Sequence, residues 1–291
     1  MTDELSLEKY LNQMGHSPQT VKSYLYTIGI FLALCKDADN FKYREILQYI
    51  EEHTQNLNSN GSKNRVLAAI KKYYDYLVEI GRRNDHPCRT LILKGKRRKG
   101  VIHHDLFTGA ELELLMEREE RYEELKIRNQ VVISLLIYQG LSSGEMQALK
   151  VRHVDLDAGT IYIKESRKQT RRHLELQPKQ YRLLDKYIHV IRPQLLRVET
   201  ETLLIGKLGT PLTIDDINYL VSTFKILFPE RNLNPKTIRQ SVIANWLNEK
   251  NFPLEQVQLY AGHRWISSTA EYRYVPVEEQ RTLINKFHPL G

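Results

Sequence analysis

Apolar residues recur at helical spacing along most of this chain, and that pattern constrains the fold more than any other feature. Leu7, Leu11 and Met14 fall on one helical face, because positions three and four residues apart lie together on an α-helix. Ser17-Pro18 then supplies a cap and a first-turn proline for a second helix. Similar patterns follow over residues 41–53 and 66–77. Residues 1–93 are therefore expected to form a small helical bundle.

A second pattern, alternation of apolar and polar residues, appears in one stretch. Residues 153–177 are expected to form strand, turn, strand, with Ile161 and Ile163 before a basic turn and Leu174 and Leu176 after it. Further helices are expected over residues 129–140, 178–192, 212–228, 235–250 and 253–261. The sequence predicts a mainly α fold with a small β-sheet, in two domains, the second an α+β domain over residues 105–291.

Between the two domains lies a basic segment, which we expect to be a linker over residues 94–104. Its core, KGKRRKG, is cationic and flanked by glycine. One interpretation is a solvated connection between domains. The other is a cationic strap that crosses DNA phosphates while the domains contact opposite faces of a duplex.

The charge balance points to a polyanionic partner. Lys and Arg number 43 against 35 Asp and Glu, giving a net charge of +8 and a pI of about 9.2, and nucleic acid is the commonest soluble polyanion. The two cysteines, Cys35 and Cys88, form no metal-binding motif or disulfide framework. No stretch is apolar enough to span a membrane. We expect a soluble cytoplasmic protein that requires no cofactor and no metal.

The residues with the clearest chemical potential lie near the C-terminus. Pro235 begins an expected helix on which Lys236 and Arg239 are one turn apart; His263 follows later, and Tyr272 comes nine residues after it. An arginine can hold two phosphate oxygens, a histidine can donate to another, and a tyrosine can attack phosphorus. Each residue alone has a simpler explanation, since the chain holds 17 tyrosines and most tyrosines pack in cores or interfaces. Their joint spacing favours phosphoryl transfer without a metal.

Four segments resemble the tyrosine recombinases, the phage integrase and Xer family. QVQLYAGHRWISSTAEYRYV resembles the family block in which the nucleophilic tyrosine follows a Gly-His pair by nine residues, and LLIYQGLSSGEMQALKVRHVDLD resembles its TGLRxxEL block. IYIKESRKQTRRHLEL resembles the family's β-hairpin, and SLEKYLNQMGHSPQTVKSYLYTIGIFLAL resembles its helical, SAM-like core-binding domain. The resemblance covers nearly the whole chain, and it implies DNA strand cleavage and rejoining.

Roles for individual residues follow from this resemblance. It implies that Tyr272 is the nucleophile, with Tyr274 as a nearby alternative, and that His263 contacts the scissile phosphate. Arg239 corresponds to the second arginine of the family, which neutralises charge on the phosphorus in the transition state. The hairpin lysine, which protonates the leaving 5′ oxygen, corresponds to Lys168 or to its neighbour Arg167. We prefer Lys168, because an ammonium gives up a proton more readily than a guanidinium.

This chain departs from the family pattern at two positions. Ser142 stands where the family has its first arginine, and Lys236 stands where it has a histidine. Serine supplies no positive charge, and a missing phosphate ligand costs on the order of 2–4 kcal/mol of transition-state stabilisation. Three arginines are candidates to replace it: Arg171, Arg172 and Arg264. Glu145 keeps the family's distance from position 142, and it either orders the local turn or acts directly.

The resemblance implies a site-specific recombinase or integrase of a mobile element that acts on double-stranded DNA through a 3′-phosphotyrosine. Such a reaction implies a homotetramer on two DNA sites, with possible accessory DNA-bending proteins. Two alternative functions are also consistent with the sequence: a catalytically weak or inactive DNA-binding protein on the same scaffold, and a strand-nicking topoisomerase. The C-terminal tail, residues 275–291, is expected to form an amphipathic helix that either docks into a neighbouring copy or folds back on its own domain.

Overall fold

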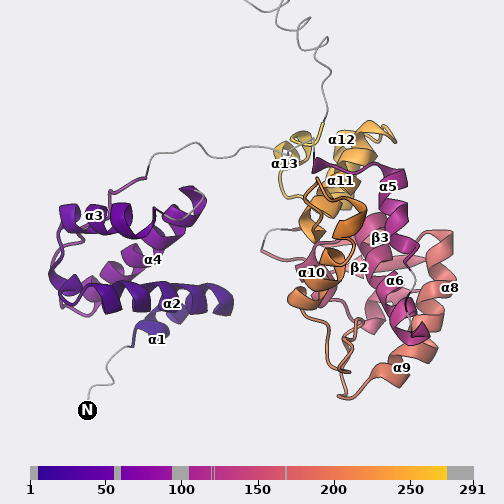
Figure 1. The fold of residues 1–291 in the computed structure, drawn as a ribbon, viewed down its shortest axis with the longest axis horizontal. Coiled ribbons are helices and arrows are strands. Elements are labelled where there is room, and N and C mark those ends of the chain that lie inside the picture. The colour runs from indigo at the N-terminus through magenta and orange to yellow at the C-terminus, as the bar shows by residue number, and fades with distance from the viewer. Residues whose placement is uncertain are drawn as a thin grey trace, which may run out of the picture. The chain divides into compact units, whose positions relative to one another are not determined.

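The computed structural model describes residues 6–55, 60–93, 105–118, 120, 122–167 and 169–273. The chain divides into two compact units, Met1–Lys99 and Gly100–Gly291, each of which is described by itself (Figure 1). The expected basic linker over residues 94–104, Lys168, Tyr274 and the C-terminal tail lie outside the described residues.

The N-terminal unit is a bundle of helices. They are α1 (Leu7–Gln13), α2 (Pro18–Leu34), the short 3-10 helix η1 (Ala38–Asn40), α3 (Tyr43–His53) and α4 (Asn60–Glu79). Ser6 and Ser17 cap α1 and α2 by accepting main-chain hydrogen bonds, which satisfies donors that a helix start otherwise leaves unpaired. Phe31 and Tyr74 are fully buried in the shared core. The Tyr74 hydroxyl donates to the Ala38 carbonyl at 2.7 Å, so its polar atom is satisfied inside the bundle.

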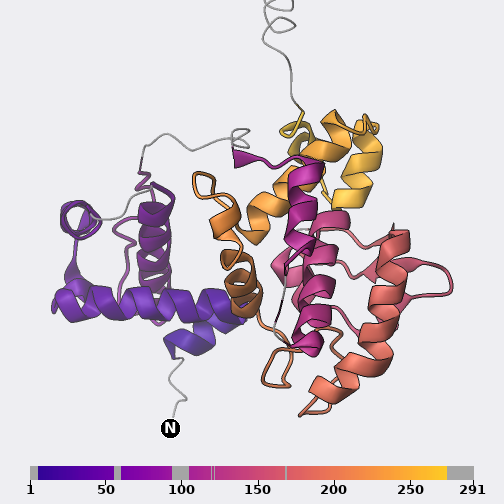
Figure 2. The same ribbon diagram turned by 45° about the vertical axis from the view of Figure 1, so that its right-hand side comes forward.

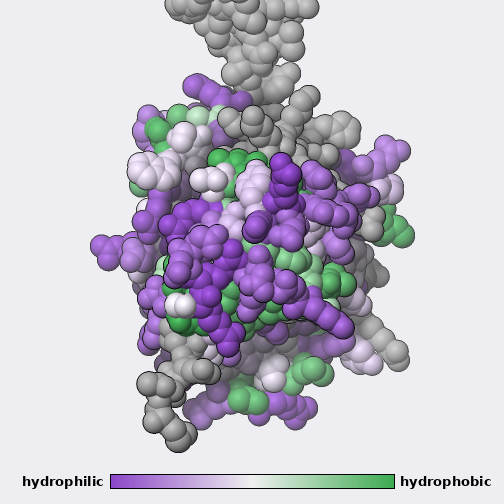
Figure 3. All heavy atoms as spheres, turned by 90° about the vertical axis from the view of Figure 1, so that its left-hand side faces the viewer, coloured by the Kyte–Doolittle hydropathy of each residue, from purple (hydrophilic) through white to green (hydrophobic). Residues whose placement is uncertain are grey.

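The face of the protein shown in Figure 3 is mostly hydrophilic, with smaller hydrophobic areas among the polar side chains. Exposed apolar side chains of α2 include Tyr26, Ile30 and Leu34. Scattered exposed apolar residues are normal on folded proteins.

The C-terminal unit is built around two buried helices, α6 (Glu123–Tyr138) and α11 (Pro235–Asn248), which pack against each other. Ten residues of each are buried, as expected for a helix that is covered on all sides. α8 (Pro178–Lys186) lies along the other side of α6 (Figure 2). The other helices of this unit are α5 (Gly109–Glu113), η3 (Leu114–Met116), α7 (Ser143–Gln147), η4 (Val151–His153), the π-helical segment η5 (Tyr187–Ile191), α9 (Arg192–Leu195), α10 (Ile214–Ser222), η6 (Lys225–Leu227), α12 (Leu254–Ala261) and α13 (Ile266–Ala270).

A three-stranded antiparallel sheet completes this unit, in the order β1 (Val154–Asp155), β2 (Thr160–Ile163) and β3 (Arg172–Glu175). Ile163 pairs with Arg172, and Ile161 with Leu174. Burial alternates along β3, so that Arg172 and Leu174 face inward while the residues between and after them are exposed. An arginine therefore occupies a core-facing position of this sheet.

The predicted fold class is confirmed: a mainly helical chain with a small sheet, an N-terminal helical unit and a C-terminal α+β unit. The expectation of one helix over 212–228 is wrong in detail, because α10 ends at Ser222 and a separate 3-10 turn follows. The hydroxyls of Ser222 and Thr223 bond back to carbonyls of the last turn, a contact that competes with helix continuation. No helix in the described part of the chain is long and apolar enough to cross a membrane.

Candidate active site

Arg239 lies on the buried side of α11, at the centre of a cluster of charged side chains. Asn234 caps this helix through its side chain, and Pro235 occupies the first turn. The Arg239 guanidinium donates from Nη1 to the Gly140 carbonyl at 2.5 Å and from Nη2 to the Ala261 carbonyl. Burial lowers the pKa of Arg239, whereas Glu145 raises it. An arginine nevertheless stays charged in a protein, so a positive charge is fixed inside the unit.

Ser142 uses its side chain to begin α7. Its main-chain N–H and its hydroxyl both donate to Glu145 Oε2 at 2.9 Å, while Ser142 Oγ accepts from the Glu145 N–H. This reciprocal arrangement is a capping box. The structure therefore places Ser142 beside the charged cluster, but with its polar atoms engaged in the helix start.

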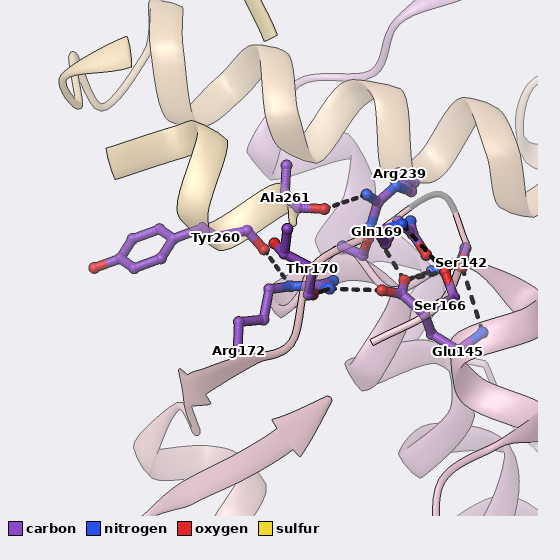
Figure 4. Close-up of polar contacts among 10 residues, drawn as sticks. Ser142, Glu145, Ser166, Gln169, Thr170, Arg172, Arg239, Tyr260 and Ala261 are labelled. Carbon is purple, nitrogen blue, oxygen red and sulfur yellow. Dashed lines mark hydrogen bonds and ion pairs between the residues drawn. The ribbon is translucent and has the colours of Figure 1, made fainter. Parts of the chain in front are cut away.

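Glu145 joins two arginines from distant parts of the chain (Figure 4). Its Oε1 accepts from Arg172 Nη1 at 2.6 Å, and its Oε2 lies 3.4 Å from Arg239 Nη1. Burial acts to raise the pKa of Glu145, but the charges of Arg172 and Arg239 outweigh it, and the pKa lies below its usual value. The carboxylate is thus ionised at neutral pH and neutralises one of the two guanidinium groups.

Arg172 reaches this cluster from the start of β3. Its Nε donates to the Tyr260 carbonyl at 2.8 Å, which aims the guanidinium at Glu145 beneath the turn that ends α12 (Figure 4). That turn passes through Gly262 with φ +68°. A β-carbon at Gly262 would lie 2.4 Å from Arg172 Nη1, so glycine is required here both by the backbone conformation and by the close approach of Arg172.

His263 follows this turn and is held by Thr269, whose hydroxyl lies 2.9 Å from Nδ1 of the ring. Burial, followed by the charges of Arg239 and Arg172, lowers the pKa of His263 to about 4. The imidazole is therefore neutral at pH 7.

Tyr272 lies just after α13, with its ring stacked on the ring of His263. The two centroids are 6.0 Å apart and the planes are inclined by 21°. The main chain is fixed on both sides, because the Tyr272 N–H donates to the Thr269 carbonyl and Asn248 donates to the Tyr272 carbonyl. Burial raises the pKa of the phenol, while a hydrogen bond from Gln240 and the charge of Arg239 oppose that rise. Tyr272 is therefore protonated at neutral pH.

The connection between β2 and β3 folds over the cluster. The Thr170 N–H donates to the Gly262 carbonyl at 3.0 Å, and Gln169 forms a β-bridge with His263. Oriented to satisfy both of its neighbours, the Gln169 amide donates to Glu145 Oε1 and accepts from Arg239 Nη2, each at 3.1 Å. A neutral amide thus lies against the charged groups of Glu145 and Arg239 (Figure 4).

The remaining predicted positions lie apart from this buried cluster. Lys236 is exposed although Arg239, three residues later on the same helix, is buried, so the edge of the buried side of α11 lies between the two residues. Arg167, Arg171 and Arg264 are also exposed. Arg264 donates to the Ser166 carbonyl at 3.1 Å. Arg171, Arg172 and Arg264 are the candidates to replace the arginine that Ser142 displaces, and of these three Arg172 is buried.

Together these groups form a site suited to an oxyanion. Two guanidinium groups and one carboxylate, beside a neutral histidine and a neutral tyrosine, leave one uncompensated positive charge in a buried setting. Burial of a net charge is costly unless a counter-charge is bound. In the described residues no group of acidic, histidine or cysteine side chains is arranged to hold a metal ion.

Comparison with known proteins gives a consistent result. Residues 106–279 match the model of the phage integrase family, and residues 6–81 match that of the phage integrase N-terminal SAM-like domain. The chain is 25% identical to the tyrosine recombinase XerC of Lactobacillus leichmannii, with 96% of each chain covered, and 25% identical to the tyrosine recombinase XerD of Listeria monocytogenes, with 95% of each covered.

Two solved structures share the fold. XerH recombinase bound to its difH substrate in a pre-cleavage complex matches with a TM-score of 0.70 at 19% identity, covering 92% of this chain and 79% of that one. A lambda integrase dimer bound to a core site matches with a TM-score of 0.65 at 16% identity, covering 92% of each chain.

Proposed function

Because the chain belongs to the phage integrase family, we propose that it cleaves and rejoins double-stranded DNA at specific sites through a 3′-phosphotyrosine on Tyr272. The observation that carries this proposal is the stacking of Tyr272 on His263 beside the buried Arg239. Three residues that are separated in the sequence thereby form one site within a single chain. The relatives solved on DNA substrates support DNA as the partner.

In the proposed reaction the Tyr272 oxygen attacks the scissile phosphorus, a new O–P bond forms, and the bond from phosphorus to the 5′ oxygen breaks. Arg239 balances the charge that develops on the nonbridging oxygens. His263 is held through Nδ1 by Thr269, so its Nε2 is the nitrogen available to the phosphate. Lys168, or Arg167 in its place, protonates the leaving 5′ oxygen, and the tyrosine proton passes to solvent or to a neutral base at the site.

A 5′ hydroxyl from a partner strand then attacks the phosphotyrosine and releases Tyr272. One phosphodiester is exchanged for another at each step, so bond energy is conserved and no nucleotide cofactor is needed. Exchange of both strands between two DNA sites calls for a homotetramer, and we propose that the reaction moves a mobile element, with accessory DNA-bending proteins as further partners. Lys236 is exposed on α11, where it would contact DNA phosphate rather than the scissile group.

Covalent capture tests the proposal. The protein is incubated with genomic DNA of its host, denatured with detergent, and the protein-linked fragments are sequenced; nicked duplexes with the recovered sites then measure the rate of adduct formation. We expect an adduct from the wild type, none from Tyr272→Phe, and an adduct from the matched control Tyr274→Phe. If Tyr274→Phe forms no adduct and Tyr272→Phe still forms one, Tyr274 is the nucleophile in place of Tyr272.

One observation favours a second candidate function, a DNA-binding protein that does not cut. Ser142 stands where the family has an arginine, and its hydroxyl is used in the capping box of α7. Sequence-selective DNA binding by the wild type, without any covalent adduct at the bound sites, would support this alternative against the recombinase.

A further inference from the structure

Arg172 is a buried cation that has no role in the reaction proposed above. Its side chain is 5% exposed. Two of its nitrogens have partners: Nε donates to the Tyr260 carbonyl, and Nη1 donates to Glu145. The third, Nη2, is buried and has no hydrogen-bond partner among the described residues. A buried charged donor is rarely left unpaired, because it loses its hydration without gaining a replacement.

The surroundings of Arg172 show what kind of partner is missing. Glu145 is the carboxylate that faces it, and that carboxylate is shared with Arg239. The pKa of His263 is depressed in part by both arginines, so the histidine adds no charge but lies within their electric field. Two guanidinium groups that share one carboxylate are one negative charge short of neutrality, and a phosphodiester carries one negative charge.

The position of Arg172 also fits a phosphate ligand. Its guanidinium lies against the Gly262 backbone, which leads directly to His263, and next to the carboxylate that contacts Arg239. The Gln169 amide, which contacts Glu145 and Arg239, is attached to the β2–β3 connection. Displacement of this neutral amide would open the arginine pair to an oxyanion.

We propose that Arg172 is the second phosphate-binding arginine of this site and supplies the charge that Ser142 does not. The inference rests on the proposed function, since it assigns Arg172 to the phosphate of the same reaction. Arg172 Nη2 donates to a nonbridging oxygen of the scissile phosphate, while Arg239 donates to the other. Glu145 holds both guanidinium groups in position, and Ser142 fixes Glu145 through the capping box.

The first test uses sulfate and needs neither a DNA site nor activity. Thermal unfolding is followed while sulfate is titrated against chloride at equal ionic strength, for the wild type, Arg172→Met and Arg171→Met. Arg171 is the exposed neighbour and loses the same charge. We expect sulfate to stabilise the wild type and Arg171→Met alike, with an affinity about tenfold to a hundredfold weaker in Arg172→Met. Equal sulfate affinity in the wild type and Arg172→Met overturns the proposal.

The second test measures adduct formation on a nicked duplex obtained by covalent capture. Arg172→Met should slow the reaction by on the order of 10²–10³, and Arg172→Lys, which keeps the charge but not the planar fork, should fall between. The double variant Ser142→Arg/Arg172→Met should react at least about tenfold faster than Arg172→Met alone. A defect from mere loss of structure would not be repaired by an arginine at position 142, so a lack of rescue in folded protein refutes the assignment.

The two tests separate this inference from the proposed function. If the wild type forms no adduct at sites that it binds, the recombinase proposal fails, yet the sulfate titration still decides whether Arg172 binds an oxyanion. If the adduct forms and Arg171→Met shows the defect in place of Arg172→Met, the recombinase proposal stands and the assignment to Arg172 is wrong.

Discussion

Substitution of Glu145 by glutamine should strongly destabilise the C-terminal unit, because it leaves two buried guanidinium groups facing each other without a carboxylate. Gln retains the shape, and at this position it can still complete the capping box with Ser142. The change therefore removes charge with little other alteration. Glu145 is 4% exposed at its side chain, so solvent cannot replace the lost negative charge.

The magnitude follows from the two contacts. At an effective dielectric constant near 20, separations of 2.6 Å and 3.4 Å correspond to attractions of about 6 and about 5 kcal/mol. Burying Glu145 offsets several kcal/mol of this sum, and breaking a buried pair by removal of one partner costs about 3–5 kcal/mol in practice. We expect Glu145→Gln to lower the free energy of unfolding by about that amount.

Urea unfolding followed by tryptophan fluorescence measures the effect. Both tryptophans of the chain, Trp246 and Trp265, lie in the C-terminal unit, so the signal reports on this unit alone. Glu113→Gln is the matched control: Glu113 pairs with Lys179 at 2.7 Å, but on the surface, with 44% of its side chain exposed. That pair should contribute less than about 1 kcal/mol.

The effect should also depend on pH and on anions. The pKa of Glu145 is lower in the folded protein than in the unfolded one, so its stabilisation is complete above the unfolded value and is lost as pH falls through the folded value. The gap between wild type and Glu145→Gln should close in that acidic range. Sulfate should stabilise the variant more than the wild type, because the variant buries one more uncompensated charge. A loss below about 1 kcal/mol at pH 7, with no added sulfate dependence, would refute the proposed charge arrangement.

Two further predictions concern the turn that ends α12. The pKa of His263 falls from 6.5 to about 4 on folding, so the unfolded chain takes up a proton first as the pH is lowered. The free energy of unfolding should therefore drop by about 1–3 kcal/mol between pH 6.5 and pH 4. In urea titrations His263→Gln should lack this drop, and a pH profile identical to that of the wild type would contradict the prediction. Gly262→Ala should cost about 2–4 kcal/mol and weaken sulfate binding, because the added β-carbon would lie 2.4 Å from Arg172 Nη1 at a residue with φ +68°. The control Gly144→Ala has open space around it and an ordinary φ, and equal losses in the two variants would show that displacement of Arg172 is not the cause.

Several features of the site can be predicted from local sequence, and others cannot. The nine-residue step from His263 to Tyr272 is visible in the sequence, and so is the capping box, because both lie within short segments. The alternation of Arg172, Leu174 and Leu176 with polar residues in the sequence indicates that Arg172 faces the core. That signal singles out Arg172 from the exposed Arg171 and Arg264, but it becomes decisive only once the strand's register is known.

The shared use of Glu145 could not be predicted in this way. Its two arginine partners lie 27 and 94 positions away, and the packing of β3 and α11 brings them together. The sequence also does not predict the different exposure of Lys236 and Arg239. A helical spacing of three places two residues near one face, but the boundary of the buried stripe decides which of them is covered. α11 places that boundary between them.

The charge balance at Glu145 also bears on why a serine is compatible with position 142. An arginine added there, beside Arg172 and Arg239, would raise the number of guanidinium groups around one carboxylate to three. Neutrality would then require two negative charges from outside rather than one. A serine keeps the free protein one anion short, and its hydroxyl is used to fix Glu145. On this reasoning Ser142→Arg alone should make the C-terminal unit more dependent on sulfate for stability. The same substitution in Arg172→Met restores the original count of charges, so the rescue and the sulfate dependence have a common electrostatic cause.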